Sequence, residues 1–301
     1  MDRAFDRLAL LNGKDRSDKH PLIHPRDAAS LLVIDRRETP YKLLMGLRHQ
    51  KSSFMPDVYV FPGGALDLAD LELAKSYLPD LTKRSLNSSI LSGRDSLTLE
   101  TYEQAELFTP HSHQEITRLA GIAENLLPDH EPSLSFKATQ REIGAGLILC
   151  ALRELYEETG LHLYSDFKVV QQEQSQLSHP FGPDELPFSH LSPLFEGIVY
   201  LSRAITPPGI KKRFDTRFFL HDYRGPQGWT GRGDNELVKT AWVSFEEALS
   251  LKIHPMTRVV LEDLNEHLSS LTAFEQPRQV AFYQYLGKRF EIGAIEMETP
   301  S

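Results

Sequence analysis

Short apolar runs separated by turn residues divide this chain into expected strands. Residues 28–34 form a nearly continuous apolar run, which is typical of a strand buried on both faces. Residues 41–48 predict its neighbour, and residues 58–61 predict a third strand that ends at Pro62-Gly63-Gly64. Further strands are expected later in the chain, at 197–201, 217–220 and 241–243, and residues 162–170 look extended.

Helical spacing of apolar residues predicts the remaining elements. The strongest pattern covers about 137–159 and ends at Gly160, because glycine suits the left-handed position after a helix C-terminus. A helix is expected from about Phe245, and Thr257 to Lys288 is helical in period. Residues 68–78 and 113–127 predict helices within a mostly helical insertion at about 67–140.

Strands on both sides of a long helix indicate an α/β or α+β sandwich with a mixed sheet. We expect an N-terminal extension over residues 1–25 and one main domain over 26–250. Residues 251–301 are expected to form a helical C-terminal tail packed on that domain.

Composition and charge narrow the classes of function. Of the 301 residues, 40% are hydrophobic and 25% charged, the balance of an ordinary globular protein. The formal net charge of −9 argues against broad binding to nucleic acid. No apolar run approaches the roughly 18 residues of a membrane span, and the first residues do not resemble a signal peptide. We therefore expect a cytoplasmic protein without nucleic-acid or membrane partners, and the lone Cys150 is expected to be a small buried hydrophobe.

Acidic side chains gather near the end of the long predicted helix. At about 100° per residue, Glu157 and Glu158 fall one turn after Glu154 on the same side. These acids lie in the last two turns, where the helix dipole disfavours negative charge. Such a cluster invites a hard divalent cation with oxygen ligands. The alternative is a solvated acidic helix face.

The wider pattern resembles the Nudix hydrolases. Residues 153–161, Arg-Glu-Leu-Tyr-Glu-Glu-Thr-Gly-Leu, match the second half of the Nudix box at every defined position. Residues 61–64, Phe-Pro-Gly-Gly, match the strand end that opens the box, and residues 241–249 look like the late strand and helix of that fold. The resemblance covers about residues 26–250. It implies an α/β/α sandwich that hydrolyses a diphosphate bond in a small nucleotide-derived substrate with Mg²⁺ or Mn²⁺.

The resemblance also assigns roles to residues of the box. It implies that Glu154, Glu157 and Glu158 hold the metal and that Arg153 orients Glu154 or Glu157 by an ion pair. Gly63 and Gly64 are expected to let the backbone pass close to the metal and the phosphates, or simply to form a tight turn. The general base is open among the carboxylates near the metal.

The box of this chain is split. The family has 14 positions from the box glycine to its arginine, but Arg153 comes 89 positions after Gly64, so about 75 residues are inserted. The first glutamate of the box, eight before the arginine, falls on Ala145, and Glu142 is out of register. The residue that replaces this glutamate is open.

A split box of this kind resembles a subgroup related to the peroxisomal acyl-coenzyme A diphosphatases. Residues 53–64, 152–163 and 205–219 are similar to segments of that subgroup. Arg48 lies 13 before Phe61, as the first arginine of the coenzyme A motif does, but Ser53 and Asp57 do not match the rest of that motif. Coenzyme A or acyl-coenzyme A is the first substrate hypothesis. ADP-ribose, NADH or a nucleotide sugar is the second, and a non-catalytic nucleotide-binding module is the third.

Residues outside the box complete the hypothesis. Glu236 is the first choice for a further metal ligand, with Asp234 behind it, although either can be an ordinary surface acid. Arg48, Arg213 and Arg217 are candidates to bind substrate phosphate, with surface or strand-end charges as the alternative. Phe214 can stack on a base, although a core position fits it better. The insertion can serve as a lid, a homodimer surface or a specificity element, or be a solvent-facing appendage.

Overall fold

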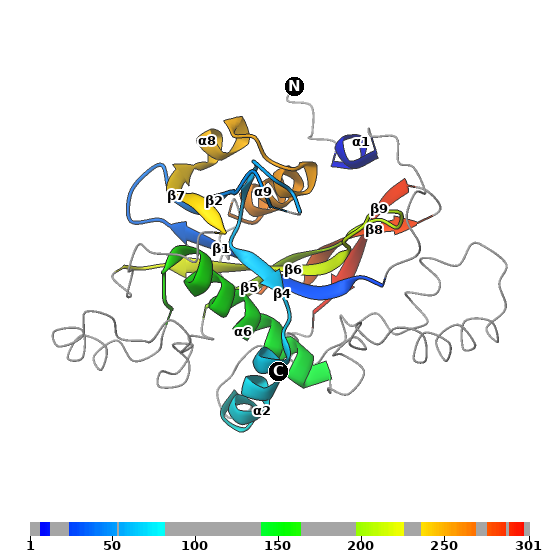
Figure 1. Ribbon diagram of the computed structural model, residues 1–301. Helices are drawn as coiled ribbons and strands as arrows, with labels where there is room; N and C mark the ends of the chain where they lie inside the picture. Colours follow the sequence, from blue (N-terminus) through cyan, green and yellow to red (C-terminus); the bar gives the residue numbers. More distant parts are fainter. Residues whose placement is uncertain are drawn as a thin grey trace, which may run out of the picture.

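The computed structural model describes residues 7–12, 24–52, 54–81, 140–163, 197–225, 236–268, 276–286 and 289–297. Within these ranges, a large mixed sheet carries helices on both faces (Figure 1). The helices are α1 Arg7–Asn12, α2 Leu68–Leu81, α6 Gln140–Thr159, α8 Phe245–Ser250 and α9 Pro255–Leu268. The strands are β1 Arg26–Asp35, β2 Lys42–Arg48, β3 Tyr59–Val60, β4 Gly63–Ala65, β5 Ile198–Ile205, β6 Phe214–Tyr223, β7 Leu237–Ser244, β8 Gln279–Leu286 and β9 Arg289–Glu296.

The sheet is organised around β1. The strand order is β3-β2-β1-β6-β5-β8-β9, while β4 pairs with β1 and β7 pairs with β2. The pairs β1–β6 and β5–β8 are parallel, and the other pairs are antiparallel. The expected sandwich with a mixed sheet is therefore confirmed.

Two hydrophobic cores explain why β1 has a nearly continuous apolar sequence. Leu31 and Val33 point into the core beneath α6 and α2, whereas Leu32 and Ile34 point into the core beneath α8, α9 and α1. A strand with a core on each face has no polar side to show in its sequence. Figure 1 shows α6 and α2 below the sheet and α8, α9 and α1 above it.

The end of α6 is as expected. The helix ends at Thr159, and Gly160 follows with a positive φ of 72°, while its N–H donates to the Tyr156 carbonyl at 2.7 Å. At Gly146, a Cβ would come within 3.0 Å of the Leu71 side chain. The small residue lets α2 pack closely on α6, so the beginning of the insertion lies beside the helix that carries the acids.

The expectation of a helical C-terminal tail is wrong beyond α9. Residues 279–296 form the antiparallel hairpin of β8 and β9, which adds two strands to the sheet. The aromatic residues Phe282, Tyr283, Tyr285 and Phe290 favour strands, and burial alternates along β9. The helical spacing of apolar residues was a weaker signal than this composition.

Several expectations fall partly or wholly outside the described residues. The helix expected at 113–127 lies outside them, and α6 begins at Gln140 rather than at about 137. His162 and Leu163 are not in a strand, and residues 164–170 lie outside the described ranges. The part of the 1–25 extension that is described contains α1, which packs on α9 and β9.

Candidate active site

The last two turns of α6 lie against the Gly63–Gly64 segment of β4. The Gly63 N–H donates to Glu158 Oε2 at 2.9 Å, although 95 positions separate the two residues. A Cβ on Gly64 would come within 2.2 Å of Glu154 Oε1, so any other residue there would displace this carboxylate. The acids of α6 and the glycines that open the sequence motif thus form one site despite the insertion between them.

Arg153 is the hub of this site. Its Nη1 donates to Glu154 Oε1 and to Glu157 Oε2, both at 2.8 Å. Its other nitrogens donate to Asp70 Oδ1 and Oδ2, both at 2.9 Å. Burial opposes the charge, but the hydrogen bonds and charge of Asp70 raise the pKa of Arg153 above its usual value. The guanidinium is therefore a permanent cation that orients two carboxylates, as expected for a positioning role.

Asp70 is a residue of this site that the sequence analysis does not predict. It lies in the first turn of α2, its side chain is 2% exposed, and both of its oxygens bind Arg153. In an uninterrupted box of 14 positions, the first glutamate stands eight before the arginine and hence six after the glycine. Six after Gly64 is Asp70. Asp70 therefore takes the place of the first glutamate when the spacing is counted from the glycine. Ala145, which takes that place when the spacing is counted from the arginine, is a fully buried core residue.

The carboxylates of the site carry more negative charge than their surroundings neutralise. The pKa of Glu154 is raised to about 7, chiefly by burial, with smaller contributions from the charges of Glu157 and Glu236 and against the opposing effect of Arg153. Burial also raises the pKa of Glu158 well above its usual value, with Glu154 as the next contributor. Glu158 Oε1 is buried without a hydrogen-bond partner among the described residues.

Glu236 reaches the same group of carboxylates through Arg48. The Arg48 Nη2 donates to Glu236 Oε1, and its Nη1 lies 4.0 Å from Glu158 Oε1. Arg48 Nε also donates to the Phe54 carbonyl at 3.1 Å, which fixes the guanidinium on β2. Asp234, the second choice for this role, lies outside the described residues.

The donor chemistry of the site fits a hard divalent cation. Carboxylate oxygens are the ligands that Mg²⁺ and Mn²⁺ prefer. Among the described residues, no group donates a hydrogen bond to the buried Glu158 Oε1, which is therefore suited to bind a cation. Within the described ranges, however, no three acidic, His or Cys side chains already converge as a metal site. Arg153 holds Glu154 and Glu157 instead, so a cation would have to draw these two carboxylates toward it.

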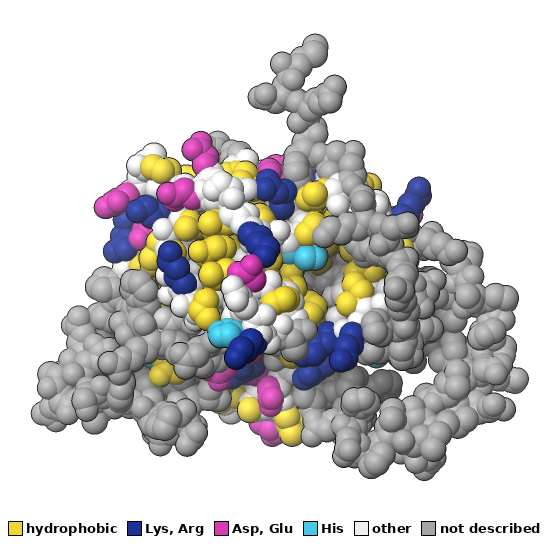
Figure 2. All heavy atoms as spheres, turned by 45° about the horizontal axis from the view of Figure 1, so that its top comes forward, with side chains coloured by type: hydrophobic (Ala, Val, Ile, Leu, Met, Phe, Trp, Pro, Cys, Tyr) yellow, Lys and Arg dark blue, Asp and Glu magenta, His cyan; other side chains and the backbone are white. Residues whose placement is uncertain are grey.

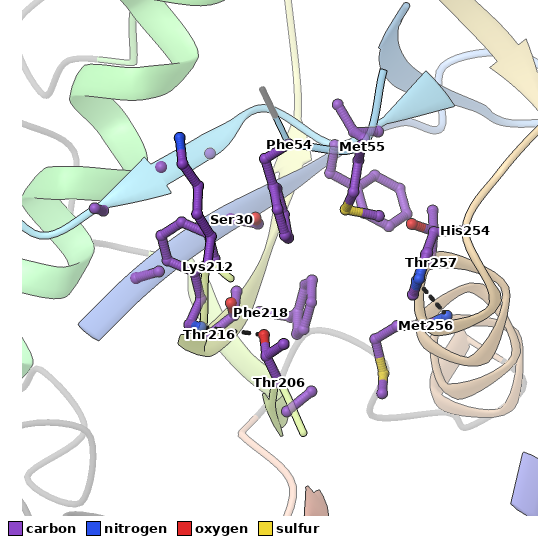
Figure 3. A pocket seen from close by; sticks show the side chains of 18 of the residues that line it. Ser30, Phe54, Met55, Thr206, Lys212, Thr216, Phe218, His254, Met256 and Thr257 are labelled. Carbon is purple, nitrogen blue, oxygen red and sulfur yellow. Dashed lines mark hydrogen bonds between the residues drawn. The ribbon is translucent and has the colours of Figure 1, made fainter. Parts of the chain in front are cut away.

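A cavity of about 520 Å³ opens beside the carboxylates. Glu154, Glu236 and Arg48 line it together with Gly63 and Gly64. Figure 3 shows Phe54, Met55 and Lys212 around the cavity, with Thr216 and Phe218 of β6 on its floor. Phe214 also lines it, in an edge contact with Phe54 at 5.0 Å between ring centroids. The preferred expectation that Phe214 is a core residue is therefore wrong, because its half-buried side chain faces the cavity.

Two of the expected phosphate-binding arginines do not line this cavity, and that expectation is corrected. Arg213 is buried and donates from Nε to the Thr206 carbonyl at 3.0 Å. Arg217 is buried and binds Asp27 and Asp215. Along β6, residues 213, 215 and 217 point to the face opposite Phe214 and Thr216, since side chains alternate along a strand. Arg48 is the candidate that remains.

Other side chains have ordinary structural roles. Cys150 is fully buried in the core beneath α6, and burial raises the pKa of its thiol, which confirms the expectation of a small buried hydrophobe. Figure 2 shows hydrophobic, acidic and basic side chains intermixed on one face, without a broad area of one charge among the coloured atoms. None of the helices in the described ranges is long and apolar enough to cross a membrane.

Comparisons with known proteins give a fold likeness only. No family model matches the chain, and no curated protein matches it. A Nudix hydrolase from Alicyclobacillus acidocaldarius is 22% identical, with 80% of this chain and 91% of that chain covered and a TM-score of 0.47. The Nudix domain of Shewanella oneidensis NrtR, complexed with ADP ribose, is 9% identical over 82% and 90% of the two chains, with a TM-score of 0.39. RenU, a Nudix hydrolase from M. smegmatis, is 13% identical over 85% and 95%, with a TM-score of 0.37. All three TM-scores are below 0.5, so the proposed function rests on the geometry of the site alone.

Proposed function

We propose that this protein is a Nudix-type hydrolase that cleaves a diphosphate linkage in a small nucleotide-derived molecule with the help of Mg²⁺ or Mn²⁺. The observation that carries the proposal is the contact between the acids of α6 and the Gly63–Gly64 segment, which reunites the two halves of a split motif. A surface helix with a solvated acidic face would not bury Glu158 to 1% exposure against a backbone N–H.

In this proposal, Glu154, Glu157, Glu158 and Glu236 would hold the cation. When bound, the cation neutralises phosphate charge and helps to activate water. Arg153 keeps Glu154 and Glu157 at a fixed separation through the hydrogen bonds from Nη1, and Asp70 holds Arg153. Water adds to one phosphorus, the bond to the bridging oxygen breaks, and a proton is transferred, so that two phosphate monoesters leave.

Coenzyme A or acyl-coenzyme A is the substrate that we propose first. The support is the resemblance of residues 53–64, 152–163 and 205–219 to the acyl-coenzyme A diphosphatase subgroup, together with Arg48 beside the carboxylates in the cavity. Cleavage would give 3′-phosphoadenosine 5′-phosphate and phosphopantetheine or its acyl form. ADP-ribose, NADH and nucleotide sugars are the alternatives of the same reaction class.

A substrate panel tests this function. The full-length protein is incubated with coenzyme A, an acyl-coenzyme A, ADP-ribose, NADH and a nucleotide sugar, each with Mg²⁺, with Mn²⁺ and with a chelator. Mass spectrometry of the products in H₂¹⁸O identifies the phosphorus that water attacks. We expect metal-dependent turnover with coenzyme A among the best substrates. Turnover of ADP-ribose without turnover of coenzyme A would reject the substrate assignment.

A matched pair of variants separates this enzyme from a contaminating phosphatase. Glu157→Gln should lower turnover by roughly 100-fold to 1,000-fold, since it removes one carboxylate charge from the site. Glu246→Gln removes an exposed carboxylate on α8 and should leave turnover unchanged. If the wild type hydrolyses no diphosphate with either metal, the protein is a nucleotide-binding module instead.

A further inference from the structure

The cavity has a second part that the carboxylates do not reach. Its polar part lies where Glu154 of α6 reaches Gly64 of β4. Its other part lies above the sheet, where α1, α9 and β9 meet. The apolar side chains that line it there share low exposure and come from four elements; they are Leu11, Phe218, Met256 and Phe290.

This second part offers little to a polar group. Leu11 and Phe290 are each 3% exposed, and Phe218 is 8% exposed. Two of the polar groups nearby are already engaged, since Thr206 Oγ1 accepts from the Phe214 N–H at 3.1 Å and His254 Nδ1 accepts from the Met256 N–H at 3.2 Å (Figure 3). Water in such a place is poorly held, so an apolar group can displace it with a gain in free energy.

The short helix α1 is fixed at both ends. Arg7 Nε donates to Asp263 at 3.0 Å and its Nη2 lies 2.8 Å from Glu266, both on α9. At the other end, the Asn12 side chain accepts from the Phe290 N–H at 2.7 Å and donates to the Phe290 carbonyl at 3.3 Å. These contacts at both ends of α1 fix the position of Leu11 relative to the backbone of Phe290. A helix held in this way forms a wall of the cavity rather than a loose arm.

We propose that this apolar part binds a flexible apolar chain joined to the diphosphate of the substrate, and that Leu11 of α1 sets the length of chain accepted. The inference rests on the proposed function, because the carboxylate end of the same cavity would place the diphosphate. Three of the walls belong to α1, α9 and β9, and the fourth is formed by Phe218 of β6. The first three elements lie outside residues 26–250, so they add selectivity to a site whose chemistry is supplied by the core of the fold.

A homologous series of ligands tests the inference without requiring turnover. The probes are non-hydrolysable methylene-bridged analogues of adenosine diphosphate that carry a methyl, butyl or octyl ester on the terminal phosphorus. Their binding to the full chain is measured by calorimetry with Mg²⁺ present. We expect the affinity to rise about threefold for each added methylene until the chain meets α1, which is the burial gain less the cost of ordering the chain.

Variants in the apolar wall decide whether α1 is responsible. Leu11→Trp should abolish the preference for octyl over methyl while leaving the methyl ester bound as in the wild type. Leu8→Trp, on the same helix but outside the lining, is the matched control and should keep the preference. Met256→Trp narrows the same space from α9 and serves if the Leu11 variant does not fold.

The outcomes separate the two proposals. Equal affinity for all three esters in the wild type, no binding of any ester, or equal effects of the Leu8 and Leu11 variants would overturn the chain-binding site. Absence of hydrolysis of every diphosphate would overturn the proposed function instead. In that case, chain-dependent binding of the analogues would still support the apolar site.

Discussion

Two groups of charged side chains, each with a buried centre, lie at different parts of this sheet, and they differ in charge balance. In the first, Arg203 donates to both oxygens of Asp215 at 2.8 and 2.6 Å, and Arg217 binds Asp27 and Asp215. Two acids meet two guanidinium groups, and the group is neutral. In the second, at the end of α6, five carboxylates lie around Arg48 and Arg153. These seven side chains carry a formal excess of three negative charges.

The difference distinguishes a structural network from the candidate active site. A balanced buried network gains specificity of packing and requires nothing further. An excess of buried carboxylate costs free energy, which is visible in the raised pKa of Glu154 and of Glu158. Such a cost persists only where the charge has a use, and a divalent cation is the partner that would neutralise it.

The largest effect is expected for Glu158→Gln. Turnover should fall by about 1,000-fold in steady-state kinetics, because a carboxylate at the centre of the site is lost.

The metal-free Glu158→Gln variant should nevertheless be more stable than the wild type, by about 1 kcal/mol, because a buried charge is removed. The wild-type group has a raised pKa in the folded state, so its stability contribution is present at low pH and is lost as pH rises through that folded pKa. The stability gain of the variant should therefore grow with pH in urea titrations.

Asp215→Asn should produce the opposite pattern. Loss of one charge from the balanced network leaves Arg203 buried with a weaker partner and should cost about 3 kcal/mol of unfolding free energy. Turnover at a permissive temperature should be close to that of the wild type. Glu72→Gln, which breaks an exposed pair with Lys75, is the control and should change stability by less than about 0.5 kcal/mol. A strong loss of turnover in stable Asp215→Asn protein would erase the distinction between the two groups.

A smaller effect on catalysis is expected for Asp70→Asn. The amide keeps the shape of the side chain but not its charge, so Arg153 is held less firmly and Glu154 and Glu157 are less well placed. We expect kcat to fall by about 10-fold to 100-fold with little change in KM. Asp70→Glu should restore part of kcat, and Asp67→Asn, at an exposed position of the same segment, should be neutral. An unchanged kcat in Asp70→Asn would show that Asp70 only stabilises the α2–α6 contact.

Much of this arrangement could be predicted from the sequence because local signals determine it. The apolar run of β1, the glycine after α6 and the spacing of Glu154, Glu157 and Glu158 each report on a few neighbouring residues. Asp70 was missed because the insertion separates it from Arg153 by 83 positions, although its spacing from Gly64 was readable. The β8–β9 hairpin is not predicted because its apolar residues recur at helical spacing, whereas its aromatic residues favour strands.

The sequence also does not predict which face of the sheet covers the site. Arg213 and Arg217 lie in the same stretch of sequence as the cavity residue Phe214. Their side chains nevertheless point away from the cavity, because successive side chains of an extended chain point to opposite faces. Whether a residue faces a cavity or a buried network depends on which helices cover each face, and that depends on the whole fold. The two core clusters show the same alternation along β1.

Direct measurement of Mn²⁺ binding by electron paramagnetic resonance addresses the charge excess at the end of α6. The wild-type chain should remove free Mn²⁺ from solution, and Mg²⁺ should compete for the same site. The double variant Glu154→Gln/Glu158→Gln should bind Mn²⁺ at least about 10-fold more weakly, whereas Asp215→Asn should bind it as the wild type does. Equal binding by the double variant and the wild type, or no binding by either, would contradict a cation site at these carboxylates.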